Sequence, residues 1–341
     1  MGALGAEPVI GRTAWVALAL GAACSTATPP RAAPPPEPER QAPAVVKAER
    51  PVICDPAERL APIDAPDLEA VGEPSTANLS AWVHTLAGPE LRGREAGTTD
   101  ALRAARAIAE RFAALGIRAP DSKGYCREFF GDGFRDHNVV AHLPPREPAC
   151  HWVMLGAHYD ALGVDRKGRL FPGADDNASG VALLLEAARL LTSAGRAPRV
   201  GLSFVAFGGE EKDLSGSRAY AGDPTRPLSD VALMINVDMV GRRPGGHPGI
   251  GYEPSGRERT KTDRLVKRAA GRAGVGVIPM LLGDRSDSAS FAPHVATVFF
   301  STAVSADYHR PTDTPERVDY AQVRRALDLV LELIASVDCG A

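Results

Sequence analysis

The stretch Gly173-Ala174-Asp175-Asp176-Asn177-Ala178-Ser179-Gly180 places two adjacent carboxylates and an amide between glycines, and an apolar run over residues 181–191 follows it. The run predicts a helix, with the acidic residues at or just before its N-terminus. Two neighbouring buried carboxylates repel each other unless positive charge compensates them. A helix N-terminus supplies about half a positive charge, and a divalent metal ion supplies far more. An ordinary helix cap, in which Asp and Asn hold free amides, is the alternative for this stretch alone.

Apolar runs on both sides of this stretch predict strands that alternate with helices. Residues 153–156 and 202–207 are apolar throughout, as expected of strands buried on both faces. This alternation predicts an α/β fold, a three-layer sandwich in which helices cover both faces of a mostly parallel, twisted mixed sheet. We expect strands near 125–130, 138–143, 152–157, 200–207, 232–238, 275–280 and 297–301, and helices near 75–86, 99–115, 181–191, 215–220, 262–273 and 320–337. The pattern contains no internal repeat and no second folded domain.

The composition is that of a globular protein with a large core. The 341 residues suit one large domain or two small ones, and 44% of them are apolar. A formal net charge of −3 gives no sign of a nucleic-acid-binding surface. We therefore expect no nucleic-acid partner.

The first 24 residues have the pattern of an export signal. Arg12 precedes an apolar run over residues 14–23, which has signal-peptide length and is too short to remain as a membrane span. Cys24 follows two alanines, as at a bacterial lipoprotein cleavage site. We expect an exported protein, either a cell-envelope lipoprotein held to the membrane by a lipid on Cys24 or, with a plain leader cut nearby, a secreted one.

Residues 25–73 are predicted to form a Pro-rich tether, and residues 74–341 the folded domain. Prolines at 29, 30, 34, 35, 36 and 38 hold such a segment extended without a core. Four cysteines follow, namely Cys54, Cys126, Cys150 and Cys339, and an exported chain meets oxidising conditions. Three pairings are open. We expect Cys126 with Cys150, which flank a short strand region, and Cys54 with Cys339, which would join the domain's ends.

Polar side chains follow the ends of four predicted strands. Ligands of open α/β sheets bind beyond the carboxyl ends of the strands. Each residue alone has an ordinary interpretation, such as a buried core histidine, a solvated Glu pair or an Asp that caps a turn. Together they would gather charge at one sheet edge, which predicts a metal site. The five strong candidate ligands are His158, Asp176, Glu211, Asp238 and His309.

Five ordered motifs then resemble a known family, the co-catalytic di-zinc aminopeptidases of metallopeptidase family M28. The motifs are His158-x-Asp160, the stretch 173–180, Glu210-Glu211-x-x-Leu214-x-Gly216-Ser217, Asn236-x-Asp238-Met239-x-Gly241 and Tyr308-His309. They lie in the family's order within residues 91–318. The resemblance implies a zinc-peptidase/phosphorylase-like fold and removal of N-terminal residues from peptides with a free N-terminus by metal-bound hydroxide.

The resemblance also implies a role for each site residue. His158 and Asp238 would bind one zinc ion, Glu211 and His309 the other, and Asp176 would bridge both. Glu210 would be the general base, Asp160 would hold the free nitrogen of His158, and Tyr308 would donate a hydrogen bond to the tetrahedral intermediate. The chemistry agrees, because two zinc ions about 3.5–4 Å apart need several carboxylates, one of them shared.

The chain departs from the family at Ser288, where a His usually stands between Ser-Asp and Phe. No metal ligand is lost, so the change concerns the substrate pocket. Asp313, four residues after His309, either orients that imidazole or forms a turn before Thr314-Pro315. Two other functions remain as alternatives: an acyltransferase similar to glutaminyl cyclase with one zinc ion, and a non-catalytic relative such as a receptor ectodomain.

Overall fold

The computed structural model describes residues 53–54, 63, 66, 72–146, 150–193, 198–243, 246–281 and 283–339. The predicted leader, Cys24 and most of the predicted tether lie outside the described residues. Within the described residues, no helix is long and apolar enough to cross a membrane.

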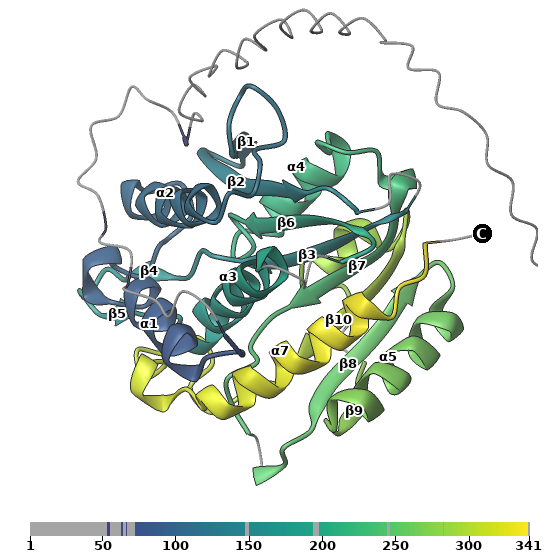
Figure 1. The fold of residues 1–341 in the computed structure, drawn as a ribbon. Helices are drawn as coiled ribbons and strands as arrows, with labels where there is room; N and C mark the ends of the chain where they lie inside the picture. Colours follow the sequence, from purple (N-terminus) through teal and green to yellow (C-terminus); the bar gives the residue numbers. More distant parts are fainter. Residues whose placement is uncertain are drawn as a thin grey trace, which may run out of the picture. The chain divides into compact units, whose positions relative to one another are not determined.

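An eight-stranded mixed sheet forms the centre of residues 49–341 (Figure 1). Its strand order is β1-β2-β6-β3-β7-β10-β8-β9. The four central strands, β6 (Gly201–Phe207), β3 (Trp152–His158), β7 (Val231–Val237) and β10 (Ala296–Ser301), are parallel to one another. The flanking strands are β1 (Cys126–Gly131), β2 (Phe134–Leu143), β8 (Ile250–Gly256) and β9 (Val277–Pro279). The carboxyl ends of the four central strands therefore lie at one sheet edge.

Helices cover both faces of this sheet, which confirms the predicted three-layer α/β fold. The helices are α1 (Thr76–Leu86), α2 (Thr99–Ala114), α3 (Ser179–Thr192), α4 (Ser215–Gly222), α5 (Arg259–Ala273), α6 (Ser288–Phe291) and α7 (Tyr320–Ala335). Helices α1, α2, α3, α5 and α7 share the larger core on one face. Helices α4 and α6 cover the other face, where Phe207, Tyr220 and Phe291 pack together.

Helix α3 is the most deeply buried helix in this arrangement. It packs against β3 on one side and against α1 and α7 on the other. Residues 179–191 are all buried, as expected of a helix that is apolar on most of its circumference. The acidic stretch that precedes α3 is therefore held by a helix with almost no freedom to move.

The predicted strands and helices are confirmed to within a few residues, but β8 was missed. Gly251, Pro254 and Gly256 disfavour strands, so this segment is indistinguishable from a loop by composition. It forms a strand because it lies between β10 and β9 with Ile250 and Tyr252 buried. The short hairpin of β4 (Gly163–Val164) and β5 (Leu170–Phe171) was also not predicted.

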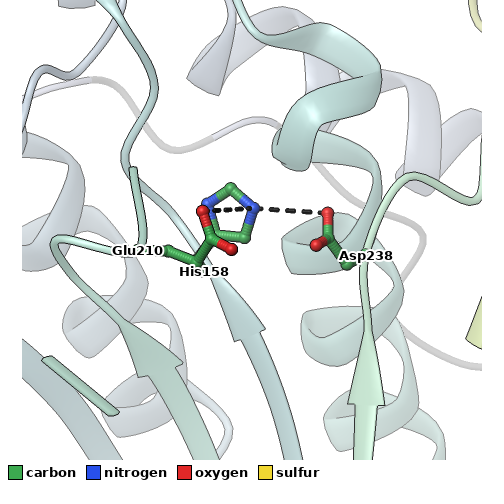
Figure 2. Close-up of side chains that lie close together, drawn as sticks. All are labelled: His158, Glu210 and Asp238. Atoms are coloured by element: carbon green, nitrogen blue, oxygen red, sulfur yellow. Dashed lines mark hydrogen bonds and ion pairs between the residues drawn. The ribbon is translucent and has the colours of Figure 1, made fainter. Parts of the chain in front are cut away.

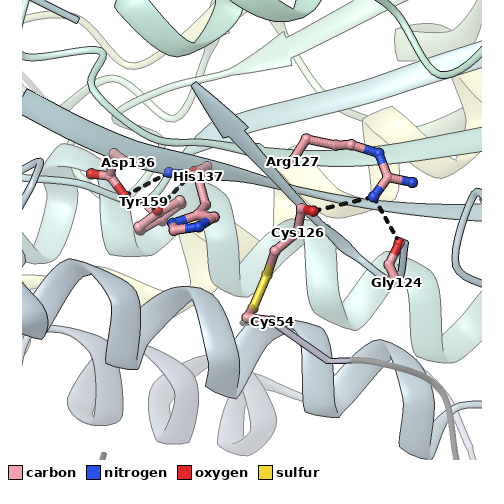
Figure 3. Close-up of a disulfide and its surroundings, with 7 residues drawn as sticks. All are labelled: Cys54, Gly124, Cys126, Arg127, Asp136, His137 and Tyr159. Carbon is pink, nitrogen blue, oxygen red and sulfur yellow. Dashed lines mark hydrogen bonds between the residues drawn. A yellow bond between two sulfur atoms is a disulfide. The ribbon is translucent and has the colours of Figure 1, made fainter. Parts of the chain in front are cut away.

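The predicted disulfide pairing is wrong. Cys54 bonds to Cys126 (Figure 3), and Cys150 bonds to Cys339. Cys126 begins β1 and Cys150 precedes β3, and the sheet order places β2 and β6 between these strands. Three strand spacings amount to about 14 Å, well beyond the reach of a disulfide. The bond from Cys54 instead connects a part of the predicted tether to the edge strand.

Peptide mapping without reductant is expected to recover Cys54 joined to Cys126 and Cys150 joined to Cys339. The bonds link residues 72 and 189 positions apart. A disulfide that closes so long a loop restricts the unfolded chain and lowers its entropy. Each bond should therefore contribute about 2–4 kcal/mol to the free energy of unfolding. Denaturant titration with and without reductant measures this contribution. A peptide that joins Cys126 to Cys150 would contradict the structure.

Candidate metal centre

The carboxyl ends of the central strands bring the predicted site residues together. His158 is the last residue of β3, and Asp238 follows β7 directly. Figure 2 shows the His158 imidazole between the carboxylates of Glu210 and Asp238. Its Nε2 lies 3.3 Å from Asp238 Oδ1 and 4.0 Å from Glu210 Oε2. Both His158 and Asp238 are buried, so this side of the site lies below the protein surface.

The carboxylate of Asp176 lies between two imidazoles. Its Oδ1 is 3.3 Å from His158 Nε2, and its Oδ2 is 3.3 Å from His309 Nε2. Glu211 Oε2 lies 3.1 Å from the same nitrogen of His309. The five predicted ligands thus form two groups that share one carboxylate. This is the arrangement that two metal ions bridged by an aspartate require.

Glu210 lies close to His158 and Asp238, and one ligand atom from each of these three side chains falls within 4.8 Å of the other two. Its carboxylate is 0.7 Å farther from His158 Nε2 than the Asp238 carboxylate is, from the distances of 4.0 and 3.3 Å. Burial raises the pKa of Glu210 to about 10, against the opposing effect of His158 and with a further rise from Asp238. In the absence of a cation Glu210 is therefore protonated at neutral pH, and a bound cation nearby would favour its charged form.

Asp175 and Asp176 adjoin in sequence but have different surroundings. Residues 174–178 form an irregular turn before α3, and the peptide bond between Asp176 and Asn177 is cis. Asp175 Oδ1 accepts a hydrogen bond of 2.7 Å from the main-chain N–H of Gly241, away from the imidazoles. Asn177 donates to the carbonyl of Val237 and accepts from the N–H of Gly180. Only the second carboxylate of the pair therefore faces the site.

Asp313 holds this turn from the other side. Its carboxylate accepts hydrogen bonds from the main-chain N–H groups of Asp175, at 3.0 Å, and Asp176, at 3.1 Å. Arg242 donates to it at 2.6 Å. The sequence had left open whether Asp313 orients His309 or forms a turn. Its described hydrogen bonds show a third arrangement, in which the loop after His309 supports the acidic turn.

Asp160 connects the end of β3 to the loop after β6. His158 Nδ1 lies 3.2 Å from the carbonyl oxygen of Asp160 and 3.5 Å from its carboxylate. The same carboxylate accepts hydrogen bonds from the main-chain N–H groups of Glu210, at 3.1 Å, and Glu211, at 3.2 Å. The predicted contact with His158 is present, and the contact with the Glu pair was not foreseen.

Two further polar residues belong to the site and were missed by sequence reasoning. Ser286 donates to Asp238 Oδ2 at 2.9 Å, and Asn236 donates to Ser286 at 2.7 Å. Asn236 occurs in a quoted motif and Ser286 lies two residues before Ser288, but their mutual contact depends on the return of the loop after β9 to the end of β7. They orient the Asp238 carboxylate.

Tyr308 and His309 form the open side of the site. Their rings stack with centroids 3.8 Å apart, and Tyr308 is 38% exposed. Partial burial and the nearby carboxylates, Asp176 and Glu211 among them, raise the pKa of Tyr308 well above its usual range, so its hydroxyl is a donor at neutral pH. Ala161, Leu162 and Phe171 line a small pocket beside Asp176, Glu211 and His309.

The donor set and its charge fit zinc. Two imidazoles and three carboxylates are typical zinc ligands. Burial would raise the pKa of Asp176, yet hydrogen bonds with His158 and His309 lower it to about 2, and the same contact helps to raise the pKa of His309 to about 10. Burial also raises the pKa of Glu211 to about 7. Without metal, protons on the imidazoles thus compensate the carboxylates, and bound cations would displace those protons.

Comparison with known proteins identifies the family. The model for peptidase family M28 matches residues 138–334, which contain all five candidate ligands. The chain belongs to peptidase family M28. The uncharacterized protein YfbL of Escherichia coli is 32% identical to this M28 chain over 234 residues, which cover 58% of the chain and 70% of YfbL. Aminopeptidase YwaD of Bacillus subtilis is 28% identical over 188 residues, 52% of the chain and 39% of YwaD, so the match spans well under two thirds of that relative.

Solved structures show the same fold. BSAP, a zinc aminopeptidase from Bacillus subtilis, superposes with a TM-score of 0.65 at 17% identity, covering 77% of this chain and 95% of BSAP. A glutaminyl cyclase from Bacteroides thetaiotaomicron superposes with a TM-score of 0.63 at 19% identity, covering 79% and 100%. The M28 chain therefore has an architecture that serves more than one chemistry, and its function must be argued from its own site.

The two adjacent aspartates give a matched pair of variants. Asp176→Asn removes the shared negative charge, so zinc bound per chain, measured by metal analysis after dialysis, should fall from two toward none. Asp175→Asn keeps the oxygen that accepts from Gly241 and should retain both ions. Two tightly held zinc ions in Asp176→Asn would contradict the shared carboxylate.

Asp175→Asn should also change how stability depends on pH. Burial and the neighbouring Asp313 raise the pKa of Asp175 from 3.8 to about 8. A raised pKa means that the folded state keeps a proton that the unfolded chain loses, so this stabilisation falls as pH rises from about 4 to about 8. Between these limits, thermal unfolding should show a shallower loss of stability in Asp175→Asn than in the wild type.

Proposed function

We propose that this M28 chain is an aminopeptidase with two zinc ions that removes N-terminal residues from peptides. One observation carries the proposal: the Asp176 carboxylate points one oxygen at each of two imidazoles, His158 and His309, which belong to separate ligand groups. Asp238 would complete one zinc site and Glu211 the other. A single-metal site has no use for a carboxylate shared in this way.

The residues around this pair have complementary tasks. Zinc ions bound there would lower the pKa of a shared water and polarise the scissile carbonyl. Glu210 takes a proton from the attacking water and delivers it to the leaving amine, as a general base and then a general acid. Asp160 holds Glu210 in place through its main-chain N–H. Tyr308, a donor on the open side, stabilises the negative charge that develops on the carbonyl oxygen.

The charge around the site favours a free amino terminus as substrate. Glu210, Glu211, Asp176 and Asp238 gather at one sheet edge, and Asp287 is buried nearby. Carboxylates left over after zinc is bound attract a substrate ammonium group. A small cavity of about 10 Å³, enough for one water molecule, adjoins this edge at Ala161, Leu162 and Phe171. This arrangement suits removal of single residues better than cleavage within a chain.

The proposed setting is the cell envelope or the exterior. It rests on the leader pattern of residues 1–24 and on Cys24 as a lipid attachment site. The two disulfides of the described residues suit an oxidising compartment.

Glu210→Gln should keep both zinc ions and lose turnover. The substitution preserves shape but removes the group that exchanges protons, which typically contributes about 10²–10⁴-fold to the rate. The measurement is kcat on an aminoacyl-nitroanilide together with zinc per chain. A variant with two zinc ions and most of the wild-type rate would exclude Glu210 as the base. A wild type with one zinc ion would favour the cyclase-like alternative, and a wild type with none would favour a non-catalytic relative.

A pair of peptides tests the exopeptidase assignment. The zinc-loaded protein is incubated with one peptide in two forms, with a free and with an acetylated N-terminus, and products are followed by mass spectrometry. Stepwise loss of residues from the free form alone is expected, because acetylation removes the ammonium charge. Cleavage of the acetylated form at internal bonds would show that the site accepts the middle of a chain, and would contradict the exopeptidase assignment.

A further inference from the structure

Arg94 is a fully buried arginine with an unusual set of partners. It lies in the loop Leu91-Arg92-Gly93-Arg94-Glu95-Ala96-Gly97 between the first two helices and is 0% exposed. Its guanidinium donates to four main-chain carbonyl oxygens, those of Leu86, Tyr159 (2.7 Å), Pro172 (2.8 Å) and Gly173 (2.9 Å). No carboxylate of the described residues forms an ion pair with it. A buried charge of this kind is costly, so its position calls for a reason beyond core packing.

Three of the four carbonyls, those of Tyr159, Pro172 and Gly173, belong to the segments that carry His158 and Asp176, and the fourth ends α1. Tyr159 stands between His158 and Asp160, and Gly173 begins the turn that presents Asp176. One guanidinium therefore spans the end of β3 and the start of the acidic turn. The side chains of His158 and Asp176, which these two segments carry, lie 3.3 Å apart.

The loop that carries Arg94 is itself held to the site. Gly163 N–H donates to the carbonyl of Gly93 at 3.1 Å, and Ala161 N–H donates to that of Arg94 at 3.4 Å. Lys212, next to the Glu210-Glu211 pair, donates to the carbonyl of Ala96 at 2.8 Å. The loop 91–97 thus contacts both the segment after β3 and the segment after β6, so displacement of Arg94 would reach three of the ligand-bearing segments.

We propose that Arg94 is a positioning residue for the metal centre, which holds the His158 and Asp176 segments at the separation that two zinc ions require. This inference rests on the proposed zinc chemistry. Metal ligands tolerate errors of only about 0.2 Å, so a loop that relaxes after loss of Arg94 would disturb both ions. The planar fork of five N–H donors can reach several carbonyls at once, whereas the single ammonium of lysine cannot.

Electrostatics agrees with this role. Burial lowers the pKa of Arg94 to about 10, while Asp160, Asp313 and Asp176 oppose that shift, so the group stays charged at neutral pH. Its charge offsets part of the repulsion among the site carboxylates without taking up their oxygens. Those oxygens remain free to bind metal.

The chain offers a matched control in Arg189. This arginine is also buried, at 2% exposed, but it forms a bidentate ion pair with Glu186, at 2.8 and 2.7 Å, within α3. It lies in the last turns of that helix, away from the acidic turn at its other end. Arg189→Met should therefore destabilise the fold without acting on the metal centre.

The test compares zinc affinity with stability in the wild type, Arg94→Gln, Arg94→Lys and Arg189→Met. Zinc dissociation constants come from competition with a chromogenic chelator, and Tm is measured in chelated and zinc-loaded protein. Arg94→Gln should bind zinc about 10–100-fold more weakly, the effect typical of residues that orient metal ligands, and its Tm should rise less on loading. Arg94→Lys should recover only part of the affinity. Arg189→Met should lose Tm in both forms and keep its affinity.

Two results would overturn the inference: wild-type zinc affinity in Arg94→Gln, or an equal loss of affinity in Arg189→Met at a matched loss of Tm. If Arg94→Gln does not fold, Arg94→Lys is judged by the same criteria. A wild type that binds no zinc removes the proposed function and this inference together. A wild type that binds two ions beside unaffected Arg94 variants removes this inference alone.

Discussion

The carboxylate of Asp176, shared between His158 and His309, is the contact on which the arrangement of this protein depends. It brings together ligands from the ends of separate strands and places them beside several other buried acids. Such a concentration of negative charge would push the strand ends apart unless cations or protons compensate it. Helix α3 opposes this separation through its packing, because residues 179–191 are all buried and moving the helix outward would expose apolar surface. Bound zinc ions would reduce the repulsion between the carboxylates directly. Zinc would thus allow this fold to hold several acidic side chains at one sheet edge.

Two buried arginines complete the compensation in different ways. Arg242 donates to Asp313, and the Asp313 carboxylate accepts hydrogen bonds from main-chain N–H groups of the acidic turn. The guanidinium of Arg242 therefore acts on the turn through an intervening carboxylate. Arg94 contacts carbonyl oxygens alone and leaves every site carboxylate free. An arginine paired directly with Asp176 or Glu211 would compete with the metal ions. Neither guanidinium binds the carboxylates of Asp176 or Glu211, so neither competes with the metal ions. Their positive charges still reduce the repulsion between the site carboxylates.

The convergence of the candidate ligands could be anticipated from sequence because most of them stand next to the end of a strand or the start of a helix that its own neighbours define, whereas His309 lies in the loop after β10. His158 and Asp238 follow continuous apolar runs, and Asp176 precedes another. Apart from the short β4–β5 hairpin, the failures concern contacts between segments that are far apart in the sequence. The pairing of Cys126 with Cys150 was wrong because β6, which comes later in the chain, inserts between β2 and β3. Strand β8 was missed because its stability comes from its two neighbours rather than from its residues. The partners of Arg94 likewise lie 65–79 residues away apart from Leu86, and no local pattern encodes them.

In two pairs of adjacent acidic residues, hydrogen bonds with main-chain N–H groups direct the two side chains to different places. Asp175 and Asp176 share a turn, yet the N–H of Gly241 draws the first carboxylate away and leaves the second for the imidazoles. Glu210 and Glu211 share a loop, and Asp160 holds both of their N–H groups, so their side chains diverge toward His158 and His309 respectively. In the first pair one carboxylate is turned away from the imidazoles, and in the second pair the two carboxylates face different imidazoles. The chemistry of the site is therefore set as much by hydrogen bonds from main-chain N–H groups as by the acidic side chains that make it recognisable.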